Sequence, residues 1–171
     1  GHITHAFGGG NGEEIAADVN GDVLLTVKGG VIENTYGGSN TRGNITGEVH
    51  VVVDKDPAAC DMNITNLYGG GNQAAGKAGI LEIKCTGDDP ANKIENVYGG
   101  ANAANVEGDV TLLISGGNIG NAFAGNNASG TINGAIKVVV DWSGSDCGVN
   151  NLDNVYGGGN LAPYTTPEDK T

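Results

Sequence analysis

The chain has 171 residues, among which glycine occupies 32 positions and proline only four. Twenty acidic residues against eight basic ones give a net charge of −12, which excludes a nucleic-acid-binding surface as the default function, because affinity for phosphates rests on lysine and arginine. No apolar run is long enough to cross a membrane and no signal peptide is visible, and the length suits a single domain.

A seven-residue motif, built around an aromatic residue, small residues and a closing asparagine, occurs six times. The copies are residues 5–11, 34–40, 66–72, 96–102, 121–127 and 154–160. Their aromatic residues are Phe7, Tyr36, Tyr68, Tyr98, Phe123 and Tyr156, spaced by 25 to 33 residues. A repeat of this period predicts an array of stacked units.

Each unit contains the same predicted elements in the same order. A short segment around a valine or isoleucine is followed by a glycine corner, a long strand, a second corner and the strand that ends at the aromatic residue. The long strands alternate apolar and mainly polar residues, which predicts one buried face. Their inward residues are expected to be Val23/Leu25/Val27, Val49/Val51/Val53, Leu81/Ile83/Cys85, Val110/Leu112/Ile114 and Ile136/Val138/Val140. We expect Val51, Ile83, Leu112 and Val138 to stack on one another.

The sequence therefore predicts an all-β parallel β-helix (solenoid) over residues 1–162, with three strands per rung and about five to six rungs. Stacking buries the apolar face that no unit buries alone and places parallel strands about 4.8 Å apart. Right-handed winding is expected, because parallel crossovers are right-handed in nearly all cases. Residues 163–171 are expected to form an irregular tail. The alternative, a β-sandwich of hairpins, predicts antiparallel pairing and has no use for six near-identical strands.

The motif resembles Tyr-Gly-Gly-Gly-Asn repeat segments of large bacterial surface proteins over residues 3–162. It is more distantly similar to the right-handed β-helix class that includes pectate lyases and autotransporter passenger domains. The resemblance implies a secreted or cell-surface location and a scaffold or adhesive role, and its motif contains no catalytic residue. The sequence departs from the calcium-binding nonapeptide repeats, because no Gly-x-Asp follows the Gly-Gly-x-Asn step, so their metal site is not transferred.

The aromatic ladder has a structural and a functional interpretation. Like rings stacked along the array stabilise it by about 0.5–1.5 kcal/mol per pair beyond burial. An exposed strip of Tyr36, Tyr68, Tyr98 and Tyr156 would instead bind sugar rings. Phe7 and Phe123 favour the structural interpretation, because they lack the hydroxyl. Two registers of asparagine, beginning at Asn34 and at Asn11, are expected to form side-chain amide ladders.

Acidic insertions follow the long strands in three units, at residues 54–63, 87–92 and 143–151. Insertions in repeat arrays lie on one face, often the functional one. The carboxylates on the first two insertions form a candidate calcium site, since calcium prefers crowded oxygen ligands. The candidate ligands are Asp54, Asp56, Asp61, Asp88 and Asp89. No EF-hand spacing is present, and solvated loops are the alternative.

An enzymatic function receives little support from the sequence. A glycosidase or polysaccharide lyase would use paired carboxylates, and cleavage of an anionic polysaccharide would also need clustered basic residues. Arg42 is the only arginine, and His50 is expected on the outer face of a strand. No disulfide is expected, because Cys85 should point into the core and Cys60 and Cys147 should lie about 14 Å apart along the axis.

We expect a non-enzymatic structural or adhesive β-solenoid segment of a secreted or cell-surface bacterial protein. A carbohydrate- or ligand-binding module that uses the insertion face is the second hypothesis, and a polysaccharide-cleaving β-helix is the third. The expected partners are a glycan or a host surface protein, together with flanking repeats of the same protein. We expect no nucleic-acid partner and no membrane insertion of this segment. Neither end shows a polar capping segment, so we expect a part of a longer protein.

Overall fold

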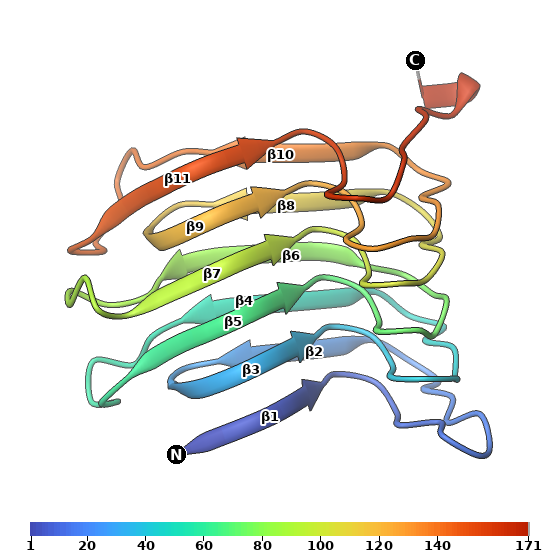
Figure 1. Cartoon of the computed structure of the whole chain (residues 1–171), viewed down its shortest axis with the longest axis horizontal. Coiled ribbons are helices and arrows are strands. Elements are labelled where there is room, and N and C mark those ends of the chain that lie inside the picture. The colour runs from blue at the N-terminus through green and yellow to red at the C-terminus, as the bar shows by residue number, and fades with distance from the viewer. Residues whose placement is uncertain (171) are drawn as a thin grey trace.

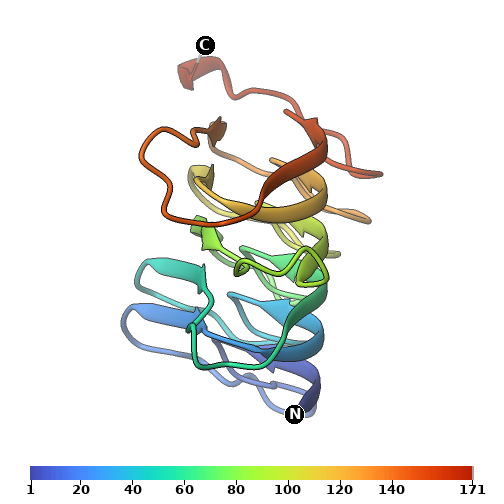
Figure 2. The same ribbon diagram turned by 90° about the vertical axis from the view of Figure 1, so that its left-hand side faces the viewer.

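The computed structural model describes residues 1–170 and is an all-β parallel β-solenoid of about five turns with two parallel sheets (Figure 1). The six-stranded sheet contains β1 (His2–Phe7), β3 (Gly30–Tyr36), β5 (Met62–Tyr68), β7 (Lys93–Tyr98), β9 (Gly117–Phe123) and β11 (Asn150–Tyr156). The five-stranded sheet contains β2 (Val23–Val27), β4 (Val49–Asp54), β6 (Gly79–Cys85), β8 (Val110–Ile114) and β10 (Ile136–Val140). The turns stack from the N-terminal to the C-terminal end, and Figure 2 shows the stack from the side of the insertions.

The register of the six-stranded sheet follows the sequence repeat. Tyr36 pairs with Tyr68, and Tyr68 pairs with Tyr98. Every pairing between neighbouring strands in both sheets is parallel, which excludes the sandwich of hairpins. The predicted stacking of equivalent motif positions on successive turns is therefore confirmed in the six-stranded sheet.

The core lies between the two sheets. In the five-stranded sheet, one row of paired residues runs through all five strands: Leu25, Val51, Leu81, Leu112 and Val138. Val51, Leu81 and Leu112 are fully buried in it. The six-stranded sheet contributes Ile64, Ile94 and Ile119, which are buried to 1 % exposure or less. The alternation of apolar residues thus selects the buried face as expected.

The predicted stack was wrong in one strand. Ile83 pairs with Val53 and Ile114, and Leu81 takes the place beside Val51. Ile83 is still fully buried, because a shift of two residues along a strand preserves the face. Gly79 occupies the first position of the strand, opposite Val110, and its φ of +58° is one that glycine adopts without strain.

The segment between each aromatic strand and the next long strand forms no sheet in the described residues. Isolated parallel bridges join Val19 to Ile45 and Val106 to Ile132 on successive turns. Some residues of these segments belong to a smaller apolar cluster, formed by Ala78, Ala101, Ala104, Val106, Val110 and Ile132. The third predicted segment therefore stacks in register without forming a continuous strand.

The tail after the last copy of the motif is anchored at its start. The hydroxyl of Tyr164 donates a hydrogen bond of 3.1 Å to the carbonyl of Gly134, and its ring packs against the smaller apolar cluster. A single 3₁₀ turn, Glu168–Lys170, follows. The end of the predicted tail, Thr171, lies outside the described residues. No helix within residues 1–170 has the length and hydrophobicity of a membrane-spanning segment.

Candidate functional site

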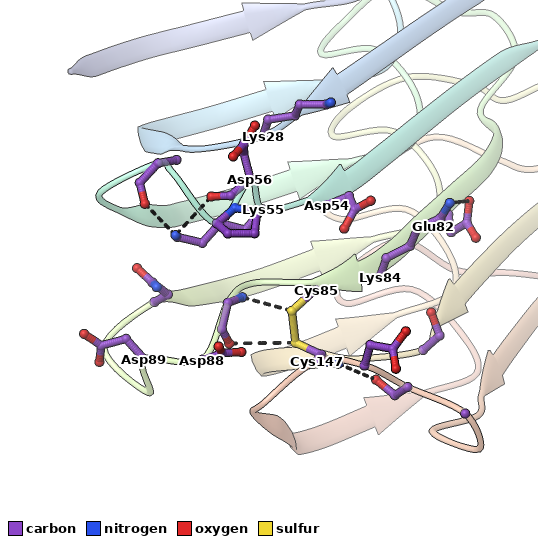
Figure 3. A pocket seen from close by; sticks show the side chains of 18 of the residues that line it. Lys28, Asp54, Lys55, Asp56, Glu82, Lys84, Cys85, Asp88, Asp89 and Cys147 are labelled. Carbon is purple, nitrogen blue, oxygen red and sulfur yellow. Dashed lines mark hydrogen bonds and ion pairs between the residues drawn. A yellow bond between two sulfur atoms is a disulfide. The ribbon is translucent and has the colours of Figure 1, made fainter.

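Each long strand turns into the following aromatic strand at a corner, and these corners lie on one side of the solenoid. A single groove of about 890 Å³ is lined by residues from the corners of several turns (Figure 3). Two of these corners are tight, at residues 28–29 and 115–116, and three contain insertions, at 55–61, 86–92 and 141–149. All three insertions contribute residues to the groove, so they lie on one face of the solenoid, as expected. Its side chains include Lys28, Asp54, Lys55, Asp56, Cys60, Glu82, Lys84, Cys85, Asp88, Asp89, Asp146 and Cys147.

The first insertion folds over the tight corner of the turn below it. The backbone amide of Asp56 donates to the carbonyl of Lys28 at 2.9 Å, and the amide of Gly30 donates to the carbonyl of Asp61 at 2.7 Å. A side chain at Gly29 would collide with Ala59. Glycine at the tight corner therefore makes room for the neighbouring insertion.

The third insertion crosses another tight corner in the same direction. A side chain at Gly116 would meet Cys147 and Ser145, so glycine again leaves the space that the insertion needs. The amide of Gly148 then donates to a carboxylate oxygen of Asp88 at 3.1 Å, in the insertion two turns away. The second and third insertions are thereby brought into contact.

Cys85 and Cys147 form a disulfide with a Cα–Cα distance of 5.3 Å (Figure 3). The prediction that the chain contains no disulfide was wrong. Cys85 lies beyond a bulge that shifts the register between Val53 and Asp54, and it pairs with Asp54 instead of with an inward residue. Cys147 is 8 % exposed because its insertion folds back over the intervening turn. Cys60 is a free, exposed cysteine.

Three insertion carboxylates close local turns. Asp56 accepts a hydrogen bond from the amide of Ala58 at 2.8 Å, and Asp89 accepts the equivalent bond from Ala91 at 2.8 Å. Both belong to an Asp-Pro-Ala sequence, and an aspartate that bonds a backbone amide two residues later is a recurrent turn device. Asp141 accepts from both the hydroxyl and the amide of Ser143, which lowers its pKa from the ordinary range.

The five candidate calcium ligands are all exposed, and they occupy different parts of the corner. Asp54, Asp56, Asp88 and Asp89 line the groove, and Asp61 does not. Among residues 1–170, no group of three or more His, Cys, Asp and Glu side chains is arranged to hold a metal ion. Sequence reasoning missed the turn role of Asp56 and Asp89, although the shared Asp-Pro-Ala sequence was a readable signal.

Opposite charges are interleaved on the outer surface beside the groove. The ammonium of Lys84 lies 3.8 Å from a carboxylate oxygen of Glu82, which also lies 3.5 Å from Nε2 of His50. That nitrogen is buried and has no hydrogen-bond partner. The ammonium of Lys55 donates to the carbonyl of Ala59 at 2.6 Å, so Lys55 helps to hold the first insertion. His50 lies on the outer face of β4, as expected.

The aromatic side chains form one continuous stack. Ring centroids of successive residues lie 4.7 to 5.2 Å apart, with planes within 12° of parallel. Tyr36, Tyr68 and Tyr98 are at most 5 % exposed, whereas Tyr156 at the end of the stack is 46 % exposed. Burial raises the pKa of Tyr36, Tyr68 and Tyr98. The ladder thus buries three of the four tyrosines considered as a sugar-binding strip.

Two asparagine ladders run parallel to the aromatic stack, as predicted. In the first ladder, the side-chain amides of Asn66, Asn96, Asn121 and Asn154 each donate to the asparagine one turn earlier, at 3.0 to 3.2 Å. In the second ladder, Asn40, Asn72, Asn102, Asn127 and Asn160 do the same at 2.7 to 3.0 Å. Both ladders satisfy polar groups along the whole length of the array.

The comparisons with known proteins give no match: no family model, no curated protein and no solved structure is significantly similar to this chain.

Proposed function

We propose that this chain is a non-enzymatic, rigid structural or adhesive segment of a secreted or cell-surface bacterial protein. The observation that supports this function best is the continuity of its ladders. One aromatic stack and one asparagine ladder extend through every turn, and a second ladder begins at His5 and continues through asparagines from Asn34 to Asn154. Interactions that repeat at each turn suit a spacer, because each unit is held by its neighbours.

The disulfide supports a location outside the reducing cytosol. Structural disulfides persist in oxidising compartments, and Cys85–Cys147 joins the last residue of β6 to the third insertion. The strongly acidic composition suits a soluble, self-repelling surface. The resemblance of the Tyr-Gly-Gly-Gly-Asn motif to repeats of bacterial surface proteins supports the same location. Right-handed winding and three-sided rungs belong to this proposal, on the general chirality of parallel crossovers.

A ligand-binding module is the second candidate function, and the groove at the insertions favours it. Its lining mixes carboxylates with Lys28, Lys55 and Lys84, which suits a polar ligand such as a glycan or a segment of a host surface protein. A polysaccharide-cleaving activity is not proposed as the function. Asp56 and Asp89 are engaged in turn hydrogen bonds, which leaves them poorly placed for acid–base work.

A glycan-array screen of the folded chain separates the two functions. If the chain is a spacer, we expect that no glycan binds to the groove. The matched comparison is a groove variant, Lys84→Glu with Asp88→Lys, whose charge changes compensate so that the net charge is unchanged. A glycan that binds the parent chain and loses binding to this variant would replace the spacer with a binding module. Release of reducing or unsaturated sugars on incubation would replace it with an enzyme.

A further inference from the structure

The two ends of the six-stranded sheet expose side chains whose counterparts in the inner turns are buried. Ile3 in β1 is 46 % exposed, whereas Ile64 in the same row is 1 % exposed. Val155 in β11 is 47 % exposed, whereas Val97 in its row is fully buried. Both ends therefore present the apolar residues that another strand covers elsewhere in the sheet.

The second asparagine ladder has a direction, and its two ends are complementary. Each side-chain amide donates toward the N-terminal end, so the ladder begins with a donor on Asn11 and finishes with an acceptor on Asn160. The amide nitrogen of Asn11 makes one long contact of 3.4 Å with exposed Glu13. Within the described residues, no donor reaches the side-chain oxygen of Asn160.

The first asparagine ladder and the aromatic stack also end in groups that have no neighbour beyond them in the described residues. In the first asparagine ladder His5 takes the first position, where its Nδ1 lies 3.4 Å from the amide nitrogen of Asn34, and Asn154 takes the last. The imidazole has a second nitrogen that remains available as a donor. The aromatic stack begins with the ring of Phe7 and ends with the half-exposed ring of Tyr156.

We propose that a second copy of this chain docks head to tail on the first, with β1 of one copy pairing in parallel with β11 of the other. Phe7 then stacks on Tyr156, and Asn11 donates to Asn160, so that all three ladders continue across the junction. The open edges of β1 and β11 supply the unpaired backbone groups that an added strand requires. Because the two docking surfaces differ, the contact does not close on itself and produces a linear series of copies.

The tail leaves this contact open. The five-stranded sheet has one strand fewer than the six-stranded sheet, so the junction leaves room for one strand above β10. The tail occupies part of this strand position, because Tyr164 is hydrogen-bonded to Gly134, shortly before β10. It leaves Val155 and Tyr156 of β11 exposed. The docking contact is therefore assigned to the six-stranded sheet.

Blocking one end at a time tests this arrangement. Ile3→Lys and Val155→Lys place a charge at one edge each, and charged residues on edge strands oppose pairing. Sedimentation velocity is measured over a range of concentrations of the full chain, in salt that screens its net charge of −12. We expect a series of oligomers for the parent chain, monomers for each variant alone, and a one-to-one dimer when the two variants are mixed. Thr65→Lys, on the exposed face of the inner strand β5, is the matched control and should behave as the parent.

A near-isosteric variant tests the polar ladder without changing the apolar edge. Asn11→Asp keeps the oxygen that accepts from Asn40 and removes the donor that faces Asn160. We expect it to weaken association by roughly fivefold or more, because two acceptors then face each other. Circular dichroism confirms that each variant folds, and Asn11→Asp serves as the test if either lysine variant unfolds.

Two results would overturn the proposal. A parent chain that remains monomeric at every concentration would show that the ends do not recognise one another, and would leave other strands as their occupants. Dimers of Ile3→Lys alone would show that β11 pairs with a second β11 about a two-fold axis. Neither result would bear on the proposed spacer function, which depends on the inner turns.

Discussion

The side-chain amide of Asn127 donates a hydrogen bond of 3.2 Å to the phenolic oxygen of Tyr68, although the two residues are 59 positions apart. Asn127 belongs to the second asparagine ladder and Tyr68 to the aromatic stack, so this bond joins two of the three ladders. It lies among the buried tyrosines, where an ionised phenol would be poorly solvated. Burial is the main cause that raises the pKa of Tyr68, and repulsion from the phenolates of Tyr36 and Tyr98 raises it further. The hydrogen bond from Asn127 lowers this pKa.

We predict that Tyr36, Tyr68 and Tyr98 make the fold sensitive to alkali. Their folded-state pKa values are raised by burial, so the unfolded chain ionises first as the pH increases. Stability is fully present below the ordinary tyrosine pKa of about 10 and is lost as the pH rises above it. Absorbance at the phenolate band should rise together with the loss of β-sheet circular dichroism. Stepwise ionisation of all tyrosines before any unfolding would contradict the prediction.

Removing the disulfide should destabilise the chain without changing its fold. The bond between Cys85 and Cys147 closes a loop with a sequence separation of 62 residues, and it restricts the unfolded state. The double variant Cys85→Ser/Cys147→Ser should lose about 2–4 kcal/mol of unfolding free energy in a denaturant titration. Cys60→Ser is the control and should retain the parent stability, because Cys60 is free and exposed. Equal stability of the double variant and the control would show that the bond does not restrict the chain.

A charge placed on the buried face of β8 should unfold the array, whereas the same charge on the outer face should not. Leu112 is fully buried, and its neighbour Leu113 points outward and is partly exposed. Leu112→Asp should cost several kcal/mol, because the carboxylate is left without a partner in the core. Leu113→Asp should change the unfolding free energy by less than about 1 kcal/mol. Similar melting temperatures for the two variants would mean that the assigned faces are wrong.

Calcium is expected to leave the stability of the chain unchanged. No group of three or more candidate ligands is arranged around a common point in residues 1–170, and Asp56 and Asp89 are engaged by backbone amides. A cation that binds only the folded chain would raise its melting temperature by mass action. Thermal melts in calcium and in chelator should therefore coincide. A higher midpoint in calcium would revive the candidate site at Asp54, Asp56, Asp61, Asp88 and Asp89.

The solenoid was predictable because the same sequence motif occurs six times and forms the same local structure each time. The aromatic residues fixed the register of the six-stranded sheet, and Tyr36, Tyr68 and Tyr98 stack as expected. Alternation alone left the register of β6 open by two residues, since Leu81 and Ile83 are both apolar and inward-facing. Periodicity identifies the buried face of a strand more reliably than it identifies which turn-to-turn partners meet.

The candidate site was less predictable because insertions do not follow the repeat. The prediction of no disulfide assumed that Cys85 points into the core and that each insertion stays at the height of its own turn. The register shift in β6 instead pairs Cys85 with Asp54. Gly116 instead allows the third insertion to fold across a tight corner and reach Cys85. The Asp-Pro-Ala turns at Asp56 and Asp89 were readable from the sequence, whereas the path of the third insertion depends on tertiary contacts.

The Cys85–Cys147 bond also determines how the chain would respond to a pulling force. The two ends of the chain lie at opposite ends of the stack (Figure 1), so tension applied through them loads the strand pairings one after another. Turns would peel away from either end until the tension reaches Cys85 or Cys147, and the covalent bond would then bear the load. The residues between the two cysteines, a separation of 62, would add about 210 Å if fully extended. The disulfide prevents this segment from extending under tension, and a reducing agent would allow it to extend.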